Sequence, residues 1–441
     1  MPKKKTALTI EERLQQALVP AEEQPYEVPE NWVWVRLENV CEHMKAGGDK
    51  PKDFSAEKVE GKEIPVVANG IEDEGIIGYT SCSGELSGSL TVAGRGTIGY
   101  SFIRMYEFFP VVRLLVVRPY DFVNLKMLKY VFDAIPEKGK GSSIPQLTIP
   151  MIKEKAIPLP PLSEQQRIVE RIEELFAKLD EAKERLQEVA DSFAVRKAAI
   201  LHKAFTGELT KRWRRENGVS DASWEEKKGE DFFDYVTSGS RGWAKYYSDK
   251  GSIFVRMGNL NHGTIELDFS DIQYVELPDQ VEGQRSKLQK NDILISITAD
   301  VGMIGLVRED MDAYINQHVA LARSKNDLYA EFLAWYFVSD VGLQQMQNKQ
   351  RGATKIGLGL QDIRSIILKI PTLPEQHEIV RLIDDLLARE RAAQQAAEQA
   401  LASIDLMKKS ILARAFRGEL GTNKASEASA LELLRQVLAE N

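Results

Sequence analysis

The chain contains two copies of one long segment, and this repeat constrains its fold more than any other feature. The run PPLSEQQRIV at Pro160–Val169 returns as PTLPEQHEIV at Pro371–Val380, and Ile200–Leu209 returns as Ile411–Leu420. Both pairs are offset by 211 positions. Solenoids and propellers repeat every 20–50 residues or so. The offset therefore indicates a duplicated module, with two copies of one activity in the chain.

Each repeated segment predicts a long helix. Apolar residues recur at alternating spacings of 4 and 3, which is the heptad pattern of a coiled coil. About 40 residues at 1.5 Å per residue give a helix of roughly 60 Å. One seam is rich in Leu and the other in Ala, which favours pairing of the two helices. The expected seam is Ile168, Ile172, Leu175, Leu179, Ala182, Leu186, Val189, Phe193 and Ile200, then Ile379, Ile383, Leu386, Glu390, Ala393, Ala397, Ala400, Ile404, Met407 and Ile411.

Local signals mark where these helices begin and end. Ser163 with Gln166 is typical of a capping box at a helix start. Gly207 and Gly418 suit the position that follows a helix. A shorter helix is expected at 9–18, where Thr9 suits the N-cap and two Glu residues occupy the first turn.

Two segments outside the long helices have short apolar runs separated by Gly, Pro and Ser, which is typical of mixed α/β domains. The predicted fold is α+β: two mixed α/β domains joined by two long antiparallel coiled-coil helices, related by an internal pseudo-two-fold repeat. The expected boundaries are an extension at 1–25, domains at 26–158 and 214–370, helices at 159–213 and 371–420, and a tail at 421–441. Strands are expected at 64–68, 90–93, 111–117, 253–256, 292–297 and 319–322, and helices at 125–135 and 328–338.

Composition excludes several classes of protein. No apolar run approaches the roughly 20 residues that span a bilayer, and no apolar signal core follows the basic start, so a cytoplasmic location is expected. Two Cys and five scattered His residues provide neither a disulfide framework nor a metal site. The net charge of −8 argues against a wholly basic surface but permits local basic faces.

Catalytic motifs are absent from the sequence. It has no phosphate-binding P-loop, no nucleophile elbow and no zinc-binding helix. The Gly-rich run Gly94–Gly99 looks like a dinucleotide loop, but a strand rather than a helix is expected after it. The Asn-Pro-Pro-Tyr-type tetrapeptide of adenine methyltransferases is missing as well. These absences disfavour an enzyme.

The chain resembles the specificity subunit of type I restriction-modification systems over nearly its whole length. The marks are two Leu/Ile-Pro-x-x-x-Glu-Gln-x-x-Ile-Val starts, at Leu159–Val169 and Ile370–Val380, and two Ala-Phe-x-Gly-Glu-Leu ends, at Ala204–Leu209 and Ala415–Leu420. The resemblance implies that the chain binds double-stranded DNA and does no chemistry itself. Each domain would recognise one half of a split site, and the helices would set the gap.

The resemblance also implies partners. Two methylation subunits would dock on the helices and bring S-adenosylmethionine, so this chain would bind no cofactor or metal of its own. Motor-nuclease subunits would join to form the restriction complex. A variant that only methylates, without a restriction partner, is equally compatible with the sequence.

Polar and basic loop residues are the candidates for DNA contact, because bases are read through donors and acceptors and phosphates through Arg and Lys. In the first domain they are Arg95, Thr97, Lys138, Lys140, Ser142, Ser143 and Gln146. In the second they are Ser238, Ser240, Arg241, Arg256, Asn259, Gln317, His318, Lys349, Gln350, Arg351, Thr354 and Lys355.

Two rival functions remain open at this point. The chain could be a coiled-coil scaffold that never binds DNA, or an enzyme with its own methyltransferase or nuclease activity. The Gly-rich, divergent domains disfavour the scaffold, and the missing motifs disfavour the enzyme. The basic run Lys211–Arg215 fits either a phosphate contact or a linker.

Overall fold

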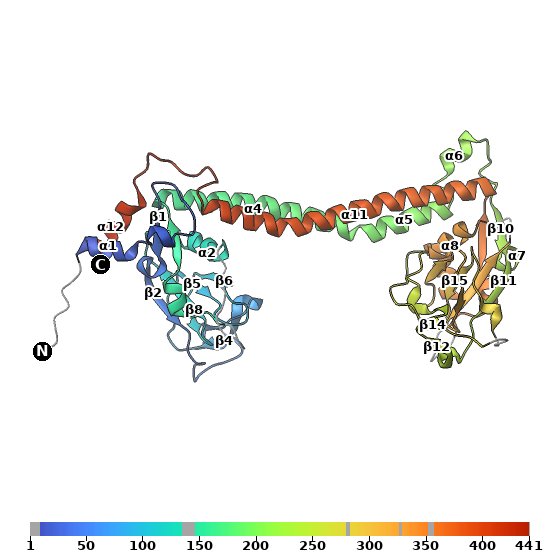
Figure 1. Ribbon diagram of the computed structural model, residues 1–441, viewed down its shortest axis with the longest axis horizontal. Coiled ribbons are helices and arrows are strands. Elements are labelled where there is room, and N and C mark those ends of the chain that lie inside the picture. Colours follow the sequence, from blue (N-terminus) through green and yellow to red (C-terminus); the bar gives the residue numbers. More distant parts are fainter. Residues whose placement is uncertain (1–8, 135–145, 279–282, 326–328, 352–356, 441) are drawn as a thin grey trace. The chain divides into compact units, whose positions relative to one another are not determined.

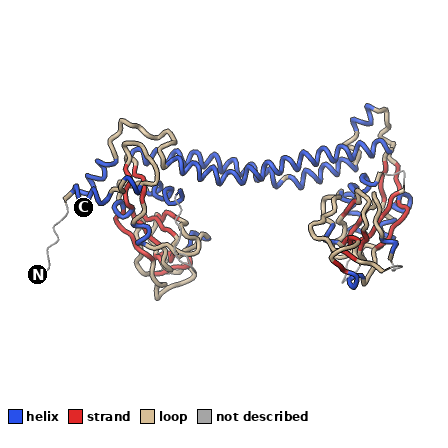
Figure 2. Tube along the Cα trace, viewed as in Figure 1, coloured by secondary structure: helices blue, strands red, loops and turns tan. Residues whose placement is uncertain are grey.

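The computed structural model describes residues 9–134, 146–278, 283–325, 329–351 and 357–440 (Figure 1). It forms two compact units, Met1–Leu186 with Ala400–Asn441, and Gln187–Gln399. Each unit contains one domain of strands and short helices together with parts of the long helices (Figure 2). Within the described ranges, no helix is long and apolar enough to cross a membrane.

The domain of the first unit contains three sheets. A four-stranded antiparallel sheet has the order β2-β8-β5-β6, a three-stranded sheet has the order β4-β3-β7, and β1 pairs with β9. The elements are β1 (Val33–Arg36), β2 (Cys41–Ala46), β3 (Ile64–Val67), β4 (Ile76–Thr80), β5 (Ser89–Val92), β6 (Ser101–Arg104), β7 (Phe109–Pro110), β8 (Leu115–Pro119), α2 (Leu125–Ala134), α3 (Ile149–Lys153) and β9 (Ala156–Leu159).

The domain of the second unit repeats this plan. Its sheets have the orders β11-β18-β15-β16 and β12-β14-β13-β17, and β10 pairs with β19. The elements are β10 (Glu225–Lys228), α7 (Gly229–Phe232), β11 (Phe233–Ser238), β12 (Tyr247–Ser248), β13 (Ser252–Val255), β14 (Tyr274–Val275), β15 (Ile293–Ser296), β16 (Ile304–Leu306), β17 (Ala313–Ile315), β18 (Val319–Ser324), α8 (Ala330–Val338), α9 (Asp340–Asn348), α10 (Leu360–Arg364) and β19 (Ile367–Ile370).

Sheet topology reveals a correspondence that the two domain sequences hide. In each domain the first strand pairs with the last, and a parallel pair (β3 with β7, β13 with β17) lies in the second sheet. The expected internal repeat therefore extends through the domains as well as the helices.

Most of the expected strands and helices are confirmed, but the strand expected at 111–117 is wrong. The apolar run is broken by a turn, in which the Leu114 amide donates to the Val111 carbonyl at 3.1 Å, and β8 begins only at Leu115. Val112 and Arg113 have φ values of 53° and 61°. Apolar character alone predicted a continuous strand, because the polar groups that hold this turn come from distant segments.

The first long helix is interrupted, contrary to the expectation of one continuous rod. It consists of α4 (Leu162–Asp191) and α5 (Phe193–Phe205), whereas the second, α11 (Leu373–Ala415), is continuous. The interruption is confined to Ser192, which keeps helical backbone angles, and its hydroxyl donates to the Val189 carbonyl at 2.7 Å.

The expected helix ends are confirmed in part. Gly207 and Gly418 have φ values of 81° and 76°, a left-handed conformation that favours glycine after a helix. The capping box expected at Ser163 is wrong, because α4 already begins at Leu162.

The long helices pair in antiparallel fashion. In the first unit Lys408 of α11 forms an ion pair with Asp180 of α4 at 2.5 Å. In the second unit Glu390 of α11 forms one with Arg196 of α5 at 2.8 Å. The residue numbers of the paired positions therefore decrease along α11 as they increase through α4 and α5, which is the antiparallel arrangement.

The expected seam is only partly buried. Ile168, Ile172, Ile379, Ile383, Ala397 and Ile404 are buried, whereas Val189 and Met407 are 43% and 48% exposed, and Leu387 is buried rather than Leu386. Two paired helices bury a narrower stripe than the heptad pattern marks.

Each domain packs against the beginning of one long helix and the end of the other. Ile168 and Val169 at the start of α4 join the first domain's core together with Leu412 and Phe416. The equivalent residues, among them Ile379 and Val380 with Leu201 and Phe205, join the second domain's core.

The two ends of the described chain lie together within the first unit. Helix α1 (Ile10–Ala17), capped by Thr9, packs against α12 (Ala430–Glu440). Arg13 Nη1 donates to the Leu438 carbonyl at 3.3 Å, and Arg435 lies 3.7 Å from Glu11.

Candidate nucleic-acid interface

A basic cavity of about 560 Å³ lies in the second domain, where β11 ends. Ser238, Ser240, Arg241 and Gln317, all expected as DNA contacts, line it. Lys245 and Arg285 also line it and were missed, because they stand alone in segments without a distinctive pattern. A polar cavity with three cationic side chains suits a phosphate-bearing ligand.

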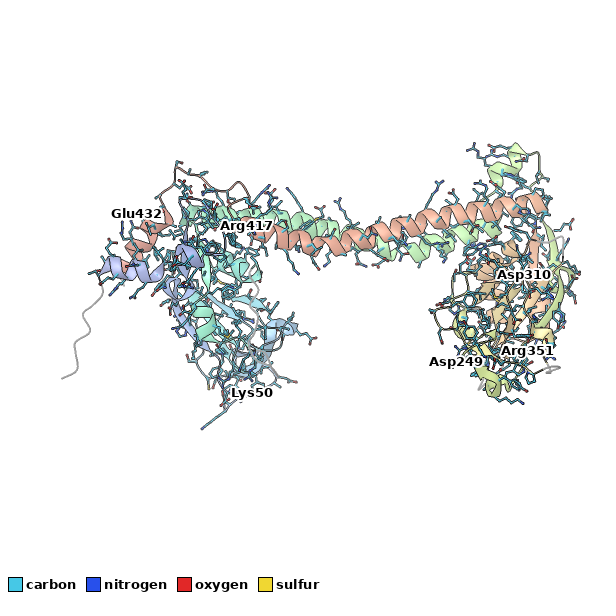
Figure 3. All side chains as sticks on the ribbon, viewed as in Figure 1. Lys50, Asp249, Asp310, Arg351, Arg417 and Glu432 are labelled. Carbon is cyan, nitrogen blue, oxygen red and sulfur yellow. The ribbon has the colours of Figure 1, made fainter. Side chains whose placement is uncertain are left out.

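Further expected residues adjoin this cavity through a chain of contacts. The Gln317 amide nitrogen lies 2.9 Å from His318 Nε2, and His318 Nδ1 lies 2.6 Å from the Thr298 hydroxyl. Thr298 in turn pairs with Gly357, which pairs with Arg351. Figure 3 labels Arg351 and shows it at the end of its domain away from α11.

Two other candidates in the second domain have partners within the protein. Arg256 follows β13 directly and pairs with Asp271 at 2.8 Å. Asn259 is only 3% exposed, and its amide donates to the carbonyls of Asp268 and Asp271. These bonds use both amide donors of Asn259 inside the loop. Lys349 and Gln350 follow α9 directly, and their DNA contact stays a prediction.

In the first domain the structure brings Arg95 and Gln146 together. The Arg95 guanidinium donates to the Gln146 side-chain oxygen at 3.1 Å, and Thr97 is exposed in the same Gly-rich turn. Lys138, Lys140, Ser142 and Ser143, and in the second domain Thr354 and Lys355, lie outside the described residues.

The turn Val112–Arg113 is a further component that sequence reasoning missed. The amides of Val112 and Arg113 donate to the carbonyls of Gly48 and Gly47 at 2.8 and 3.1 Å. Asn69 then links this turn to the Gly-rich one, since its amide donates to the Val112 carbonyl at 2.6 Å and its side-chain oxygen accepts from the Gly94 amide at 2.7 Å.

The same backbone hydrogen bonds recur in the second domain. Val111 donates to Val67 and Leu114 to Val111, just as Asn316 donates to Val255 and Val319 to Asn316. The parallel bridge Gly48–Val111 recurs as Ser240–Asn316. The bond from Leu147 to Gly94 recurs as Leu358 to Ile297, both at 2.8 Å. The residues in equivalent positions are therefore Gly48 and Ser240, Arg95 and Thr298, Val112 and Gln317, and Arg113 and His318.

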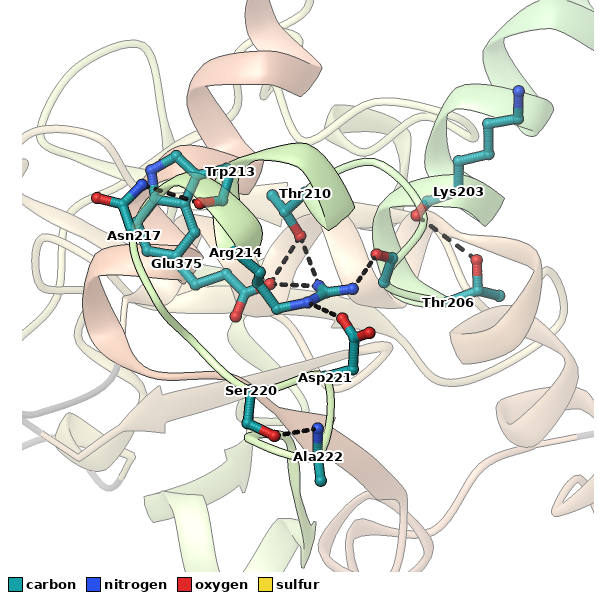
Figure 4. A network of polar contacts seen from close by, with 11 residues as sticks. Lys203, Thr206, Thr210, Trp213, Arg214, Asn217, Ser220, Asp221, Ala222 and Glu375 are labelled. Atoms are coloured by element: carbon teal, nitrogen blue, oxygen red, sulfur yellow. Dashed lines mark hydrogen bonds and ion pairs between the residues drawn. The ribbon is translucent and has the colours of Figure 1, made fainter.

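The basic run at 211–215 forms helix α6 (Lys211–Glu216), and Arg214 turns inward from it (Figure 4). Its guanidinium lies 2.6 Å from Glu375 at the start of α11 and also bonds Thr210, Asp221 and the Gly207 carbonyl. Burial lowers the pKa of Arg214, but its bonds to Glu375 and Asp221 outweigh this effect and leave the pKa raised. Arg214 is therefore a structural member of the second unit.

The described ranges contain no cluster of His, Cys, Asp and Glu side chains able to hold a metal ion. The grouped side chains at both loop ends are instead Arg, Lys, Gln, Ser and Thr, which donate hydrogen bonds to phosphate and base edges.

Comparison with known proteins identifies the family. The model of the type I restriction modification DNA specificity domain matches residues 29–191 and again 222–400. The EcoBI specificity subunit of Escherichia coli is 28% identical over 338 residues, covering 70% of this chain and 69% of that protein. The EcoDI specificity subunit of the same organism is 25% identical over 85% of this chain and 91% of its own length.

Solved structures agree on the fold. A chain from a type I restriction-modification complex aligns with a TM-score of 0.63 and 19% identity, covering 90% of this chain and all of that one. The HsdS subunit of Thermoanaerobacter tengcongensis aligns with a TM-score of 0.60 and 18% identity, covering 90% and 99%. With two matched specificity domains spanning most of its length, the chain belongs to the type I restriction-modification specificity subunits and is a DNA sequence-specificity subunit rather than a catalytic one.

Proposed function

We propose that each of the two domains recognises one half of a bipartite DNA sequence, and that the bases between the halves are not read. The single observation that carries this proposal is the repeated hydrogen-bonded frame, which presents different side chains at equivalent positions in the two domains. One frame with two sets of contact residues suits two different half-sites, because phosphate contacts position a protein while base contacts specify the sequence.

The long helices set the gap between the half-sites. A helix rises 1.5 Å per residue and DNA about 3.4 Å per base pair, so insertion of about seven residues in each helix would lengthen the gap by roughly three base pairs. Heptad insertions keep the register of the seam, which makes them the appropriate test of this part of the proposal.

The helices also bind the methylation subunits. In the first unit Leu406 of α11 is 66% exposed, and in the second unit Val195 of α5 is 70% exposed. Burial of these side chains by a partner would remove apolar surface from water. Two methylation subunits would supply S-adenosylmethionine and methylate adenine, and motor-nuclease subunits would complete a restriction complex.

The experiment is a genome-wide map of methylated adenine, made with this gene expressed beside its methylation-subunit gene and again with this gene deleted. A two-part motif with an unread gap, lost on deletion, is the expected result. An unchanged map, with the methylation subunit verified as active, would overturn the proposal and favour a scaffold.

Binding by the purified complex provides a second readout. Salt-dependent binding to DNA that carries the motif is expected, because phosphate contacts release counterions. A scaffold that never meets DNA would bind neither this duplex nor one with both half-sites scrambled.

A further inference from the structure

We infer that the two-residue turn before β8 and its counterpart before β18 are the base-contacting elements of the two domains, and that Arg113 contacts a guanine in the first half-site. The inference rests on the bipartite recognition proposed above. It adds the residues that distinguish one half-site from the other.

The two turns occupy one position in one frame. Each lies between a residue that donates to the end of a parallel strand (Val111, Asn316) and a residue that closes the turn (Leu114, Val319). Each also lies beside a small residue, Gly48 or Ser240. The frame places the two turns at equivalent sites, although only the first turn has positive φ at both of its residues. The side chains at these sites differ.

The first turn is held rigidly and presents its side chains outward. Val112 is 45% exposed and Arg113 is exposed, although both backbone amides are bonded and the Val112 carbonyl accepts from Asn69. Val112 has a φ of 53°, which is costly for a β-branched residue and persists only where the surroundings enforce it. A surface turn that its surroundings hold in an unfavourable backbone conformation can present an exposed cation in a fixed position.

Arg113 is free to bind a ligand. Within the described part of the chain, its guanidinium takes part in no ion pair or hydrogen bond. Arg95, the other cation of this loop end, already donates to Gln146. An unengaged guanidinium on a rigid turn matches the major-groove edge of guanine, where it donates to both O6 and N7.

The second turn carries Gln317 and His318 in the equivalent positions. Gln317 lines the cavity that also contains Arg241, Lys245 and Arg285, so a phosphate-binding group lies directly beside a side chain that can read a base. A glutamine amide donates to N7 and accepts from N6 of adenine. The different chemistry of the two turns would give the two half-sites different bases.

The test uses the complete complex with its methylation subunit. Adenine methylation is mapped for the wild type, Arg113→Ala, Gln317→Ala and the control Lys58→Ala. Lys58 is a suitable control because it is an exposed cation in the same domain as Arg113. It precedes the amino end of β3, whereas the turn that carries Arg113 adjoins the carboxyl end of that strand. Thermal melting of each variant verifies folding, and motif-bearing duplexes altered at single positions give discrimination ratios.

Arg113→Ala is expected to lower discrimination at one guanine of the first half-site by roughly 5- to 150-fold, the value of one bidentate base contact, with the second half-site unchanged. Gln317→Ala should relax one position of the second half-site alone, and Lys58→Ala should match the wild type.

The inference is overturned if a folded Arg113→Ala variant retains the wild-type motif, weakens all sequences equally as a phosphate contact would, or relaxes a base other than guanine. Failure of the bipartite proposal itself is distinguishable, because the wild-type map would then lack a two-part motif before any variant is considered.

Discussion

Replacement of Arg214 by Met should strongly destabilise the second unit, because it strands a buried carboxylate. Arg214 and Glu375 have side-chain exposures of 7% and 0%, and their closest atoms are 2.6 Å apart. Without the guanidinium, the Thr210 hydroxyl, at 2.7 Å, is the one side-chain donor that Glu375 retains among the described residues. Removal of one partner from a buried ion pair costs about 3–5 kcal/mol. At about 2–4 °C per kcal/mol for a unit of this size, the melting temperature should fall by roughly 6–20 °C.

Arg212→Met is the matched control. Arg212 lies on the same helix and also forms an ion pair, with Glu216 four residues on, but its side chain is 84% exposed. Exposed pairs of this kind contribute little, so no resolvable change in melting temperature is expected.

Differential scanning calorimetry is the appropriate assay, because a chain of two compact units need not unfold in one step. The transition of the second unit should move while that of the first stays in place. The double variant Arg214→Met with Glu375→Met should recover much of the loss, since no unpaired charge remains. A shift of less than about 2 °C for Arg214→Met, or a double variant less stable than either single one, would refute the reasoning.

Three further outcomes can be checked directly. Cys41 is buried, and burial raises the pKa of its thiol to about 12. Of the two cysteines, only the half-buried Cys82 should therefore react with a thiol reagent in the folded protein. Reaction of both thiols, or continued reaction in the Cys82→Ser variant, would contradict this prediction. The hydrogen bonds that Thr80 and Ser81 donate to Asp53 hold the pKa of that carboxyl well below its usual range. The ionised Asp53 therefore stabilises the fold at pH values above the pKa of an unfolded Asp, about 3.9, and this contribution is lost as the pH falls towards the lower pKa of the folded state. In denaturant titrations, the difference in unfolding free energy between the wild type and Asp53→Asn should narrow between about pH 5 and pH 2. A difference that stays constant with pH would contradict this prediction. Glu11 Oε1 and Arg435 Nη2 lie 3.7 Å apart. Cysteines placed at these two positions, in a background without Cys41 and Cys82, should therefore be joined by a bifunctional thiol reagent long enough to replace the two side chains, and failure to crosslink would contradict the packing of α1 against α12.

The long helices and the repeat could be predicted from the sequence, because their pattern is local. Spacings of 3 and 4 identified Ile168 and Ile379 as buried without any knowledge of their partners. The break at Ser192 could not be predicted in this way, and its hydroxyl bond to Val189 does not explain it, because Ser403 makes the same bond to Ala400 inside the unbroken α11. The exposure of Met407 depends on how much surface a single partner helix covers.

The loop ends of the two domains were predictable in composition but not in geometry. A Gly-rich turn pointed to Arg95 and polar side chains alone pointed to Gln317, and the structure groups both residues with other polar side chains. Arg113 was missed because it lies inside an apolar run, and the groups that bend this run, Gly47, Gly48 and Asn69, lie 44 to 66 positions earlier in the chain. A turn held by distant partners has no local sequence signal.

The junctions between domain and helix indicate what the repeat has kept and what it has let vary. Glu164 and Glu375 occupy equivalent, fully buried positions at the starts of α4 and α11. Glu164 accepts from the Trp32 indole at 2.7 Å and from Thr422 and Asn423, which follow the end of α11.

In the second unit the equivalent acceptor is served by the linker that follows α5. Arg214 donates to one carboxylate oxygen of Glu375. Within the described residues, the second oxygen of Glu375 and the Trp224 indole nitrogen have no hydrogen-bond partner. The carboxylate and one threonine donor are thus retained, since Thr422 donates to Glu164 and Thr210 to Glu375, whereas the other donors differ. A buried acceptor needs donors but not particular ones. The contact turns follow the same logic at the surface: the backbone frame is retained, and the side chains it presents are replaced. A duplicated module that keeps its frame in this way can change one half-site without disturbing the packing that both copies share.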